Sequence, residues 1–72
     1  MDFEALYELL DDNKIEFYQR ISDSVYYLHF EDKNSFKRAN SLKGRIAKYI
    51  PKERTRWHHN THILEINTQQ EG

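Results

Sequence analysis

Residues 14–30, KIEFYQRISDSVYYLHF, contain the pattern that decides the fold. From Ile15 to Ile21, mostly apolar positions alternate with polar ones, which is the period of a strand with one apolar face. Residues 22–24, Ser-Asp-Ser, carry short side chains that hydrogen-bond their own backbone in turns. Residues 25–30 are rich in aromatic and β-branched side chains, which is typical of a strand. The stretch therefore predicts an antiparallel hairpin.

The register of this hairpin determines which rings face solvent. We expect Leu28 to face the core together with Phe30. Tyr18, Tyr27 and His29 then share the opposite face of the sheet, since side chains alternate along a strand. A slip of one residue would exchange the two faces. The three rings are accessible only if the first helix leaves their face uncovered.

Helical periodicity lies on both sides of the hairpin. Residues 2–12, DFEALYELLDD, place apolar side chains at i, i+3, i+4 and i+7, which is the stripe of an amphipathic helix. A second stripe, in residues 34–50, predicts one continuous helix with Asp32 or Asn34 as N-cap and an end before Pro51. Gly44 lies inside this helix at a cost of about 1 kcal/mol relative to Ala. It marks either a close packing contact or a weak point.

The last third of the chain predicts a second hairpin. Residues 55–57, TRW, and residues 61–67, THILEIN, have strand composition, and Asn60 between them tolerates a left-handed turn. A single bent strand is the alternative, and residues 68–72 are expected to fray. Residues 1–72 therefore predict one α+β domain of order α-β-β-α-β-β. Its antiparallel sheet of three or four strands would pack on the second helix.

Charge is strongly segregated along the chain. Residues 33–56 hold nine Lys or Arg against one acid, so their local charge is +8, while residues 1–32 carry −7 and residues 57–72 carry −2. The net charge of −1 hides this polarity. Because cations bind phosphates and exposed rings stack bases, we expect a small module that binds single-stranded or structured nucleic acid. The candidate phosphate-binding residues are Lys37, Arg38, Lys43, Arg45, Lys48, Lys52, Arg54 and Arg56, and the candidate stacking residues are Tyr18, Tyr27 and Trp57.

Less specific interpretations of the same features stay open. The basic helix could carry only a solvated cationic face that the acidic first helix balances, and Trp57 is more often a core ring than a stacking platform. The alternative function is a protein-interaction or regulatory, inhibitor-like module of phage or bacterial type. In that case the polarised surface would dock a charged partner, or a second copy in a homodimer.

Other functional classes lack their signatures. The chain has two glycines and no phosphate-cradling loop, and no strained nucleophile motif accompanies its serines, so we expect no enzyme and no cofactor. His58, His59 and His62 have no Cys or acid nearby in sequence to complete a tetrahedral metal set. We expect instead a turn cluster that gains positive charge below pH ~6.5. The absence of Cys and of a run of ~20 apolar residues favours a cytoplasmic protein without a membrane segment.

Overall fold

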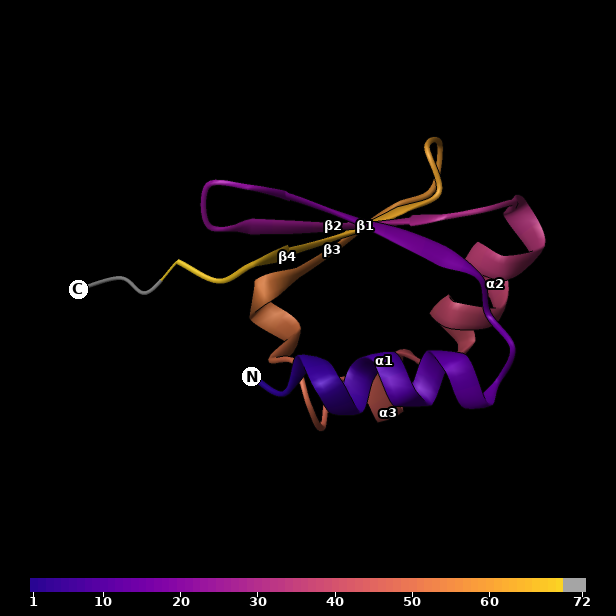
Figure 1. Cartoon of the computed structure of the whole chain (residues 1–72), viewed down its shortest axis with the longest axis horizontal. Coiled ribbons are helices and arrows are strands. Elements are labelled where there is room, and N and C mark those ends of the chain that lie inside the picture. The colour runs from indigo at the N-terminus through magenta and orange to yellow at the C-terminus, as the bar shows by residue number, and fades with distance from the viewer. Residues whose placement is uncertain (70–72) are drawn as a thin grey trace.

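Four antiparallel strands form one sheet in the order β1-β2-β4-β3, and the helices lie on one side of it (Figure 1). The computed structural model describes residues 1–69. The elements are α1 (Phe3–Asp12), β1 (Phe17–Ser22), β2 (Val25–Phe30), α2 (Lys33–Ser41), α3 (Lys43–Ile46), a 3-10 turn (Lys52–Arg54), β3 (Thr55–His58) and β4 (Ile63–Asn67). The α+β fold and the order α-β-β-α-β-β are confirmed.

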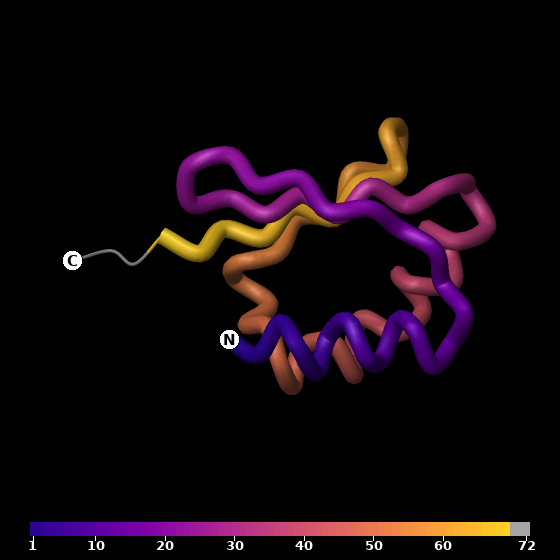
Figure 2. The backbone as a smooth tube through the Cα atoms, in the orientation of Figure 1, coloured from indigo at the N-terminus to yellow at the C-terminus, as the bar shows by residue number. Residues whose placement is uncertain are grey.

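The core lies between the sheet and the helices. The backbone trace shows α1 and α3 together beneath the sheet, and the Asp2 amide donates to the Tyr49 carbonyl at 3.0 Å (Figure 2). Both helical segments thus cover the same face, and no helix formed by residues 1–69 lies on the other face of the sheet. The buried hydrophobic side chains are Leu6, Leu9, Leu10, Ile15, Leu28, Phe30, Phe36, Ala39, Ile46, Ile50, Leu64 and Ile66.

The first hairpin has the expected register. Tyr18 pairs with His29, and Leu28 and Phe30 are 0% and 5% exposed on the helix-covered face. Two residues form the turn, of which Asp23 adopts φ 54°, a left-handed conformation that Asp tolerates. β2 then pairs with β4, so the two hairpins join into one sheet.

Side-chain hydrogen bonds cap the start of α2 and the end of α1. Asp32 is the N-cap of α2, as one of the two expected candidates, and accepts a 2.7 Å bond from the Ser35 amide. At the end of α1, Lys14 has φ 56° where Gly is usual. The Arg38 guanidinium donates to the carbonyls of Asn13 and Lys14 at this end. Arg38 therefore links α2 to α1, and its charge complements the helix dipole.

The prediction of one continuous second helix is wrong. α2 ends at Ser41, whose hydroxyl donates to the Arg38 carbonyl at 2.6 Å and so offers the backbone an alternative to the helical ladder. Leu42 has φ −96° and ψ 9°, and α3 begins after it. Ile46, in α3, and Ile50, after it, are both buried in the core. Gly44 is not a close packing contact, because nothing lies within 4 Å of the position a Cβ would take.

The second hairpin is confirmed, but its turn differs from the expectation. The sequence pointed to Asn60 as a residue that tolerates the left-handed conformation, whereas in the structure His62 adopts it, with φ 57°. A four-residue connection between His58 and Ile63 places that conformation just before β4, where the His62 ring packs 5.6 Å from Phe36. Thr68 donates to the Ser24 carbonyl through its amide, at 2.7 Å. Of the tail that was expected to fray, residues 70–72 lie outside the described residues.

Candidate nucleic-acid interface

The sheet face that carries no helix, called the open face below, displays two neighbouring stacks of planar groups. In the first stack, the rings of Tyr18 and His29 lie 4.6 Å apart at an interplanar angle of 7°. They come from paired positions on β1 and β2, and Tyr18 is 63% exposed. Flat aromatic surface that is open to solvent on a sheet is the feature on which single-stranded bases stack.

The second stack joins a cation to a ring. The Arg20 guanidinium carbon lies 4.3 Å from the centroid of the Tyr27 ring, and these two residues are also paired across β1 and β2. Arg20 Nε donates to His29 Nε2 at 3.3 Å, which connects the second stack to the first. The cation–π contact holds the Arg20 charge over the Tyr27 ring on the open face.

The electrostatics of the open face favour a neutral His29. Partial burial, and then the nearby Arg20 charge, lower the pKa of His29 below its ordinary value. A neutral imidazole can accept the Arg20 hydrogen bond, whereas a protonated one cannot. Protonation of His29 is disfavoured in the folded state. The stability that this arrangement contributes is therefore present when the pH lies above the ordinary pKa of His, and it is lost as the pH falls toward the lowered pKa of the folded state.

Replacing Arg20 tests this arrangement. In Arg20→Ala we expect the pKa of His29 to rise, but not fully to its ordinary value, because the burial of the ring persists. An NMR titration of the His29 ring protons measures the change. Lys48→Ala removes an exposed charge outside the strands, so it is a matched control. A His29 titration that is the same in both variants would contradict the coupling.

The β3 side of the open face carries charges of both signs. Arg56 and Glu65 are paired across β3 and β4, and the His58 Nε2 lies 2.9 Å from the Glu65 Oε1. Within residues 1–69 this is the one acid–base pair closer than 4.0 Å. The acids of α1 thus form no close pair with the mid-chain cations in the described part of the chain.

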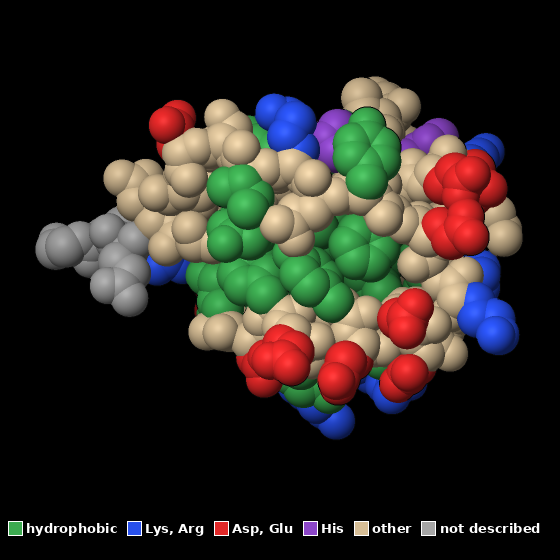
Figure 3. Space-filling model, viewed as in Figure 1, with side chains coloured by type: hydrophobic (Ala, Val, Ile, Leu, Met, Phe, Trp, Pro, Cys, Tyr) green, Lys and Arg blue, Asp and Glu red, His purple; other side chains and the backbone are tan. Residues whose placement is uncertain are grey.

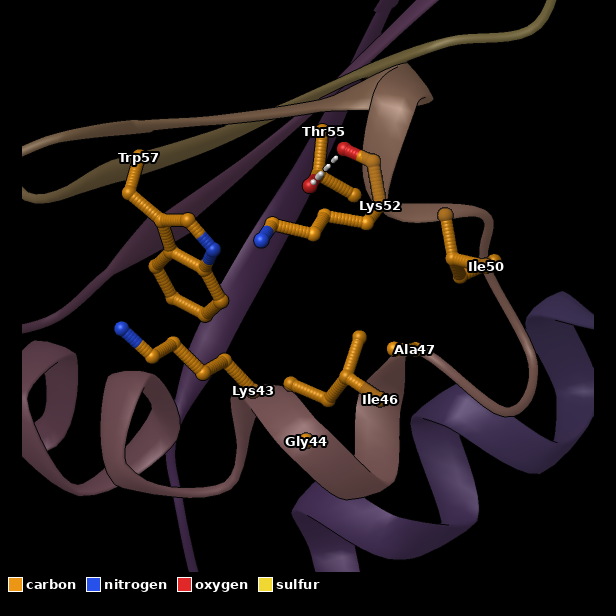
Figure 4. Close-up of a pocket in the computed structure, with 8 residues that line it drawn as sticks. All are labelled: Lys43, Gly44, Ile46, Ala47, Ile50, Lys52, Thr55 and Trp57. Atoms are coloured by element: carbon orange, nitrogen blue, oxygen red, sulfur yellow. Dashed lines mark hydrogen bonds between the residues drawn. The ribbon is translucent and has the colours of Figure 1, made fainter.

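A cavity of about 350 Å³ lies on the other side of β3, against α3. Trp57 forms one wall, and the side chains of Lys43 and Lys52 both extend toward the indole (Figure 4). Apolar atoms of Ile46 and Ile50 line its base. The two ammonium groups can donate to an anion, and the adjacent indole offers a flat apolar surface.

Trp57 has a different place from the other two candidate stacking rings. It lies on the helix-covered face, parallel to Phe30 at 6.4 Å and edge-on to Phe36 at 5.7 Å, and it is half-buried. Tyr18 and Tyr27 lie on the open face. Trp57 therefore belongs to the cavity and cannot form one platform with the two tyrosines.

The other predicted cations are dispersed. Arg38 binds the end of α1, and the Arg54 guanidinium donates to the Gln69 carbonyl, so both have main-chain partners. Lys37 lines a smaller cavity of about 280 Å³ beside His59 and His62. Arg45 and Lys48 are exposed on α3 and the turn after it. The structure brings together Lys43, Lys52 and Trp57 at the cavity, and Tyr18 and Tyr27 on the open face.

Arg20, which forms the second stack with Tyr27, was not among the predicted site residues. It lies in the acidic first part of the chain, outside the basic stretch. The available signal was its spacing, because Arg20 and Tyr18 are two residues apart on the same strand and must share a face.

The described residues form neither a metal-ligand cluster nor a membrane-spanning helix. Among residues 1–69, no three His, Asp or Glu side chains gather as metal ligands, and no helix there has the length and apolarity to cross a membrane. His58 pairs with Glu65, whereas His59 and His62 pack on Phe36.

Comparison of the chain with protein-family models, curated proteins and solved structures gives no match.

Proposed function

We propose that this protein binds single-stranded nucleic acid on its open face. The observation that carries the proposal is the pair of adjacent stacks, Tyr18 with His29 and Tyr27 with Arg20, on a sheet face that no helix covers. Base–aromatic stacking contributes about 1–3 kcal/mol per base and tolerates any sequence. Two stacks would therefore hold two neighbouring bases without reading their identity.

The phosphate contacts would follow a path from β1 across the open face to the β3 edge. Arg20 and Arg56 belong to the open face, and Lys43 and Lys52 flank the cavity on the other side of β3. A strand that crosses the open face toward β3 could continue around this edge, so that a further base reaches Trp57. The carboxylates of α1 lie on the helix side of the sheet (Figure 3).

A salt titration with a labelled oligonucleotide tests the proposal. We expect fluorescein-labelled oligothymidine to bind, with log K falling against log salt at a slope near −3 if about four phosphates are neutralised. Fluorescence anisotropy gives the affinity, and a duplex of the same length should bind less well because its bases cannot stack on the rings. Affinity that does not change with salt, or equal affinity for the duplex, would contradict the proposal.

Matched charge variants locate the phosphate path. Arg20→Ala combined with Arg56→Ala should weaken binding more than Arg45→Ala combined with Lys48→Ala, because the second pair lies on and after α3. The opposite order would place the nucleic acid on the basic helical segment.

The segregation of charge supports a second candidate function. Within residues 1–69 no carboxylate oxygen of Asp or Glu lies within 4.0 Å of a side-chain nitrogen of Lys or Arg, so the acids of α1 are available to pair with the cations of α2 and α3 in another copy or in a charged partner. Association of this kind weakens as salt rises. Light scattering across a salt series measures it.

A further inference from the structure

We propose that two copies of this chain associate through the outer edge of β1, forming one continuous eight-stranded sheet about a twofold axis at Gln19. The inference concerns the outer edge of β1, which adjoins the open face, and it stands independently of nucleic-acid binding. It depends on the free hydrogen-bonding groups of β1, on the lack of features that protect this edge, and on the match between β1 and its own antiparallel copy.

The outer edge of β1 presents unpaired main-chain groups. The Glu31 amide donates to the Glu16 carbonyl at 3.3 Å, and the hairpin register extends this pairing so that even-numbered residues of β1 bond to β2. The N–H and C=O groups of Phe17, Gln19 and Ile21 therefore point away from the sheet. Such a row is a template for another strand.

β1 lacks the features that protect the other edge strand, β3, from pairing with a strand of another molecule. β3 has four residues, follows Pro51 and a 3-10 turn, and carries an exposed Arg56. β1 has six residues in unbroken register with β2, with no Pro, Lys or bulge, and Ile21 on it is 51% exposed. The charge of Arg20 is held over Tyr27 on the open face and does not cover the edge. Natural sheets usually shield a long edge by one of these devices.

The sequence of β1 is complementary to itself in the antiparallel direction. When Gln19 lies opposite Gln19 of the second copy, Phe17 lies opposite Ile21 and Tyr18 opposite Arg20. The first pair is apolar and lies on the helix-covered side, and the second places a cation beside an aromatic ring on the open side. Each pair at Phe17, Gln19 and Ile21 is of the type that exchanges two main-chain hydrogen bonds.

Apolar surface next to the edge would also be buried. The rings of Phe3 and Tyr26 stack at 4.3 Å, and Tyr7 lies 5.5 Å from Phe17, all of them half-buried. Figure 3 shows a strip of hydrophobic side chains between the sheet and α1 on this side of the molecule. A second copy on β1 would cover part of this strip.

Charge gives this dimer a characteristic dependence on salt. A row of carboxylates over α1 lies below the apolar strip (Figure 3), and the twofold axis would bring the corresponding row of the second copy toward it. Like charges oppose association, and salt screens them. Salt should therefore strengthen a β1-edge dimer, whereas it would weaken a dimer held by α1 acids and helix cations.

Sedimentation equilibrium of the unmodified chain tests the inference. We expect a monomer–dimer equilibrium whose dissociation constant falls when NaCl is raised from about 0.01 M to about 1 M, as the Debye length shortens from ~30 to ~3 Å. Amide exchange should slow at Phe17, Gln19 and Ile21 as protein concentration rises. A chain that stays monomeric at millimolar concentration would overturn the proposal, and so would a dimer whose exchange protection lies elsewhere.

Substitutions in β1 locate the axis. The natural sequence contains no Cys, so Gln19→Cys should form an intermolecular disulfide under mild oxidation, because paired Cα atoms at the axis lie about 5.5 Å apart. Arg56→Cys, on the other edge strand, is the control and should remain a thiol. Ile21→Lys should weaken the dimer at least about 10-fold, while Ala47→Lys, on the exposed surface, should leave it unchanged. Equal cross-linking of the two Cys variants would overturn the assignment.

Discussion

Phe36→Ala is expected to lower the free energy of unfolding by about 3–5 kcal/mol. The Phe36 side chain is 2% exposed and lies 6.0 Å from the Phe30 ring and 5.7 Å from Trp57, both in edge-on geometry. Its loss leaves a cavity where α2, the sheet and the β3–β4 turn meet. A chain of 72 residues has roughly 4–11 kcal/mol of stability in total, so the variant should be close to unfolded.

Urea denaturation followed by Trp57 fluorescence measures this loss. Tyr18→Ala is a matched control, because it also removes a large ring but at a position that is 63% exposed. We expect this control to cost less than about 1 kcal/mol. Similar losses in the two variants would show that the ring cluster around Phe36 is not the centre of the core.

The double substitution Tyr18→Ala and Tyr27→Ala should reduce the affinity for oligothymidine at least 30-fold. Each ring that stacks a base contributes about 1–3 kcal/mol, so loss of both costs at least about 2 kcal/mol. Tyr27→Ala also removes the ring that the Arg20 guanidinium lies over, at 4.3 Å from its carbon to the ring centroid. Anisotropy titrations at constant salt give the ratio of affinities.

A conservative double variant controls for the fold and for the phenolic hydroxyls. Tyr18→Phe with Tyr27→Phe keeps both ring faces, and it should bind within a few-fold of the unmodified chain. Circular dichroism should show the same folded content for both double variants. If the alanine variant is folded and binds oligothymidine as tightly as the unmodified chain, the open face is not the binding surface.

Much of the local structure could be predicted because it depends on neighbouring residues. The alternation in residues 14–21 and the aromatic run in 25–30 led to the correct hairpin register, and Asp32 was correctly named as a candidate N-cap. The continuous second helix was wrong because the backbone leaves helical geometry at Leu42, whose amide donates to the Ala39 carbonyl three residues back. Apolar spacing alone does not reveal such a local break.

The candidate site was predictable only in part, because function depends on which residues meet. Tyr18 and Tyr27 were correctly placed together on one face by their strand positions. Arg38, in contrast, donates to main-chain carbonyls 24 and 25 residues away, and Arg54 donates to one that is 15 residues away. Charge content cannot reveal these hydrogen bonds. The cavity that joins Lys43 and Lys52 to Trp57 also forms only when α3 packs against β3.

The sequence by itself determined the strand faces, the helix stripes and the segregation of charge, since periodicity and composition are properties of the chain. Only the tertiary structure decided that β2 pairs with β4, that both helical layers cover one face, and that Trp57 lies apart from Tyr18 and Tyr27. The physical reason is that several arrangements satisfy the same local patterns. The choice among them depends on burying Leu28, Leu64 and the helix stripes in one common core.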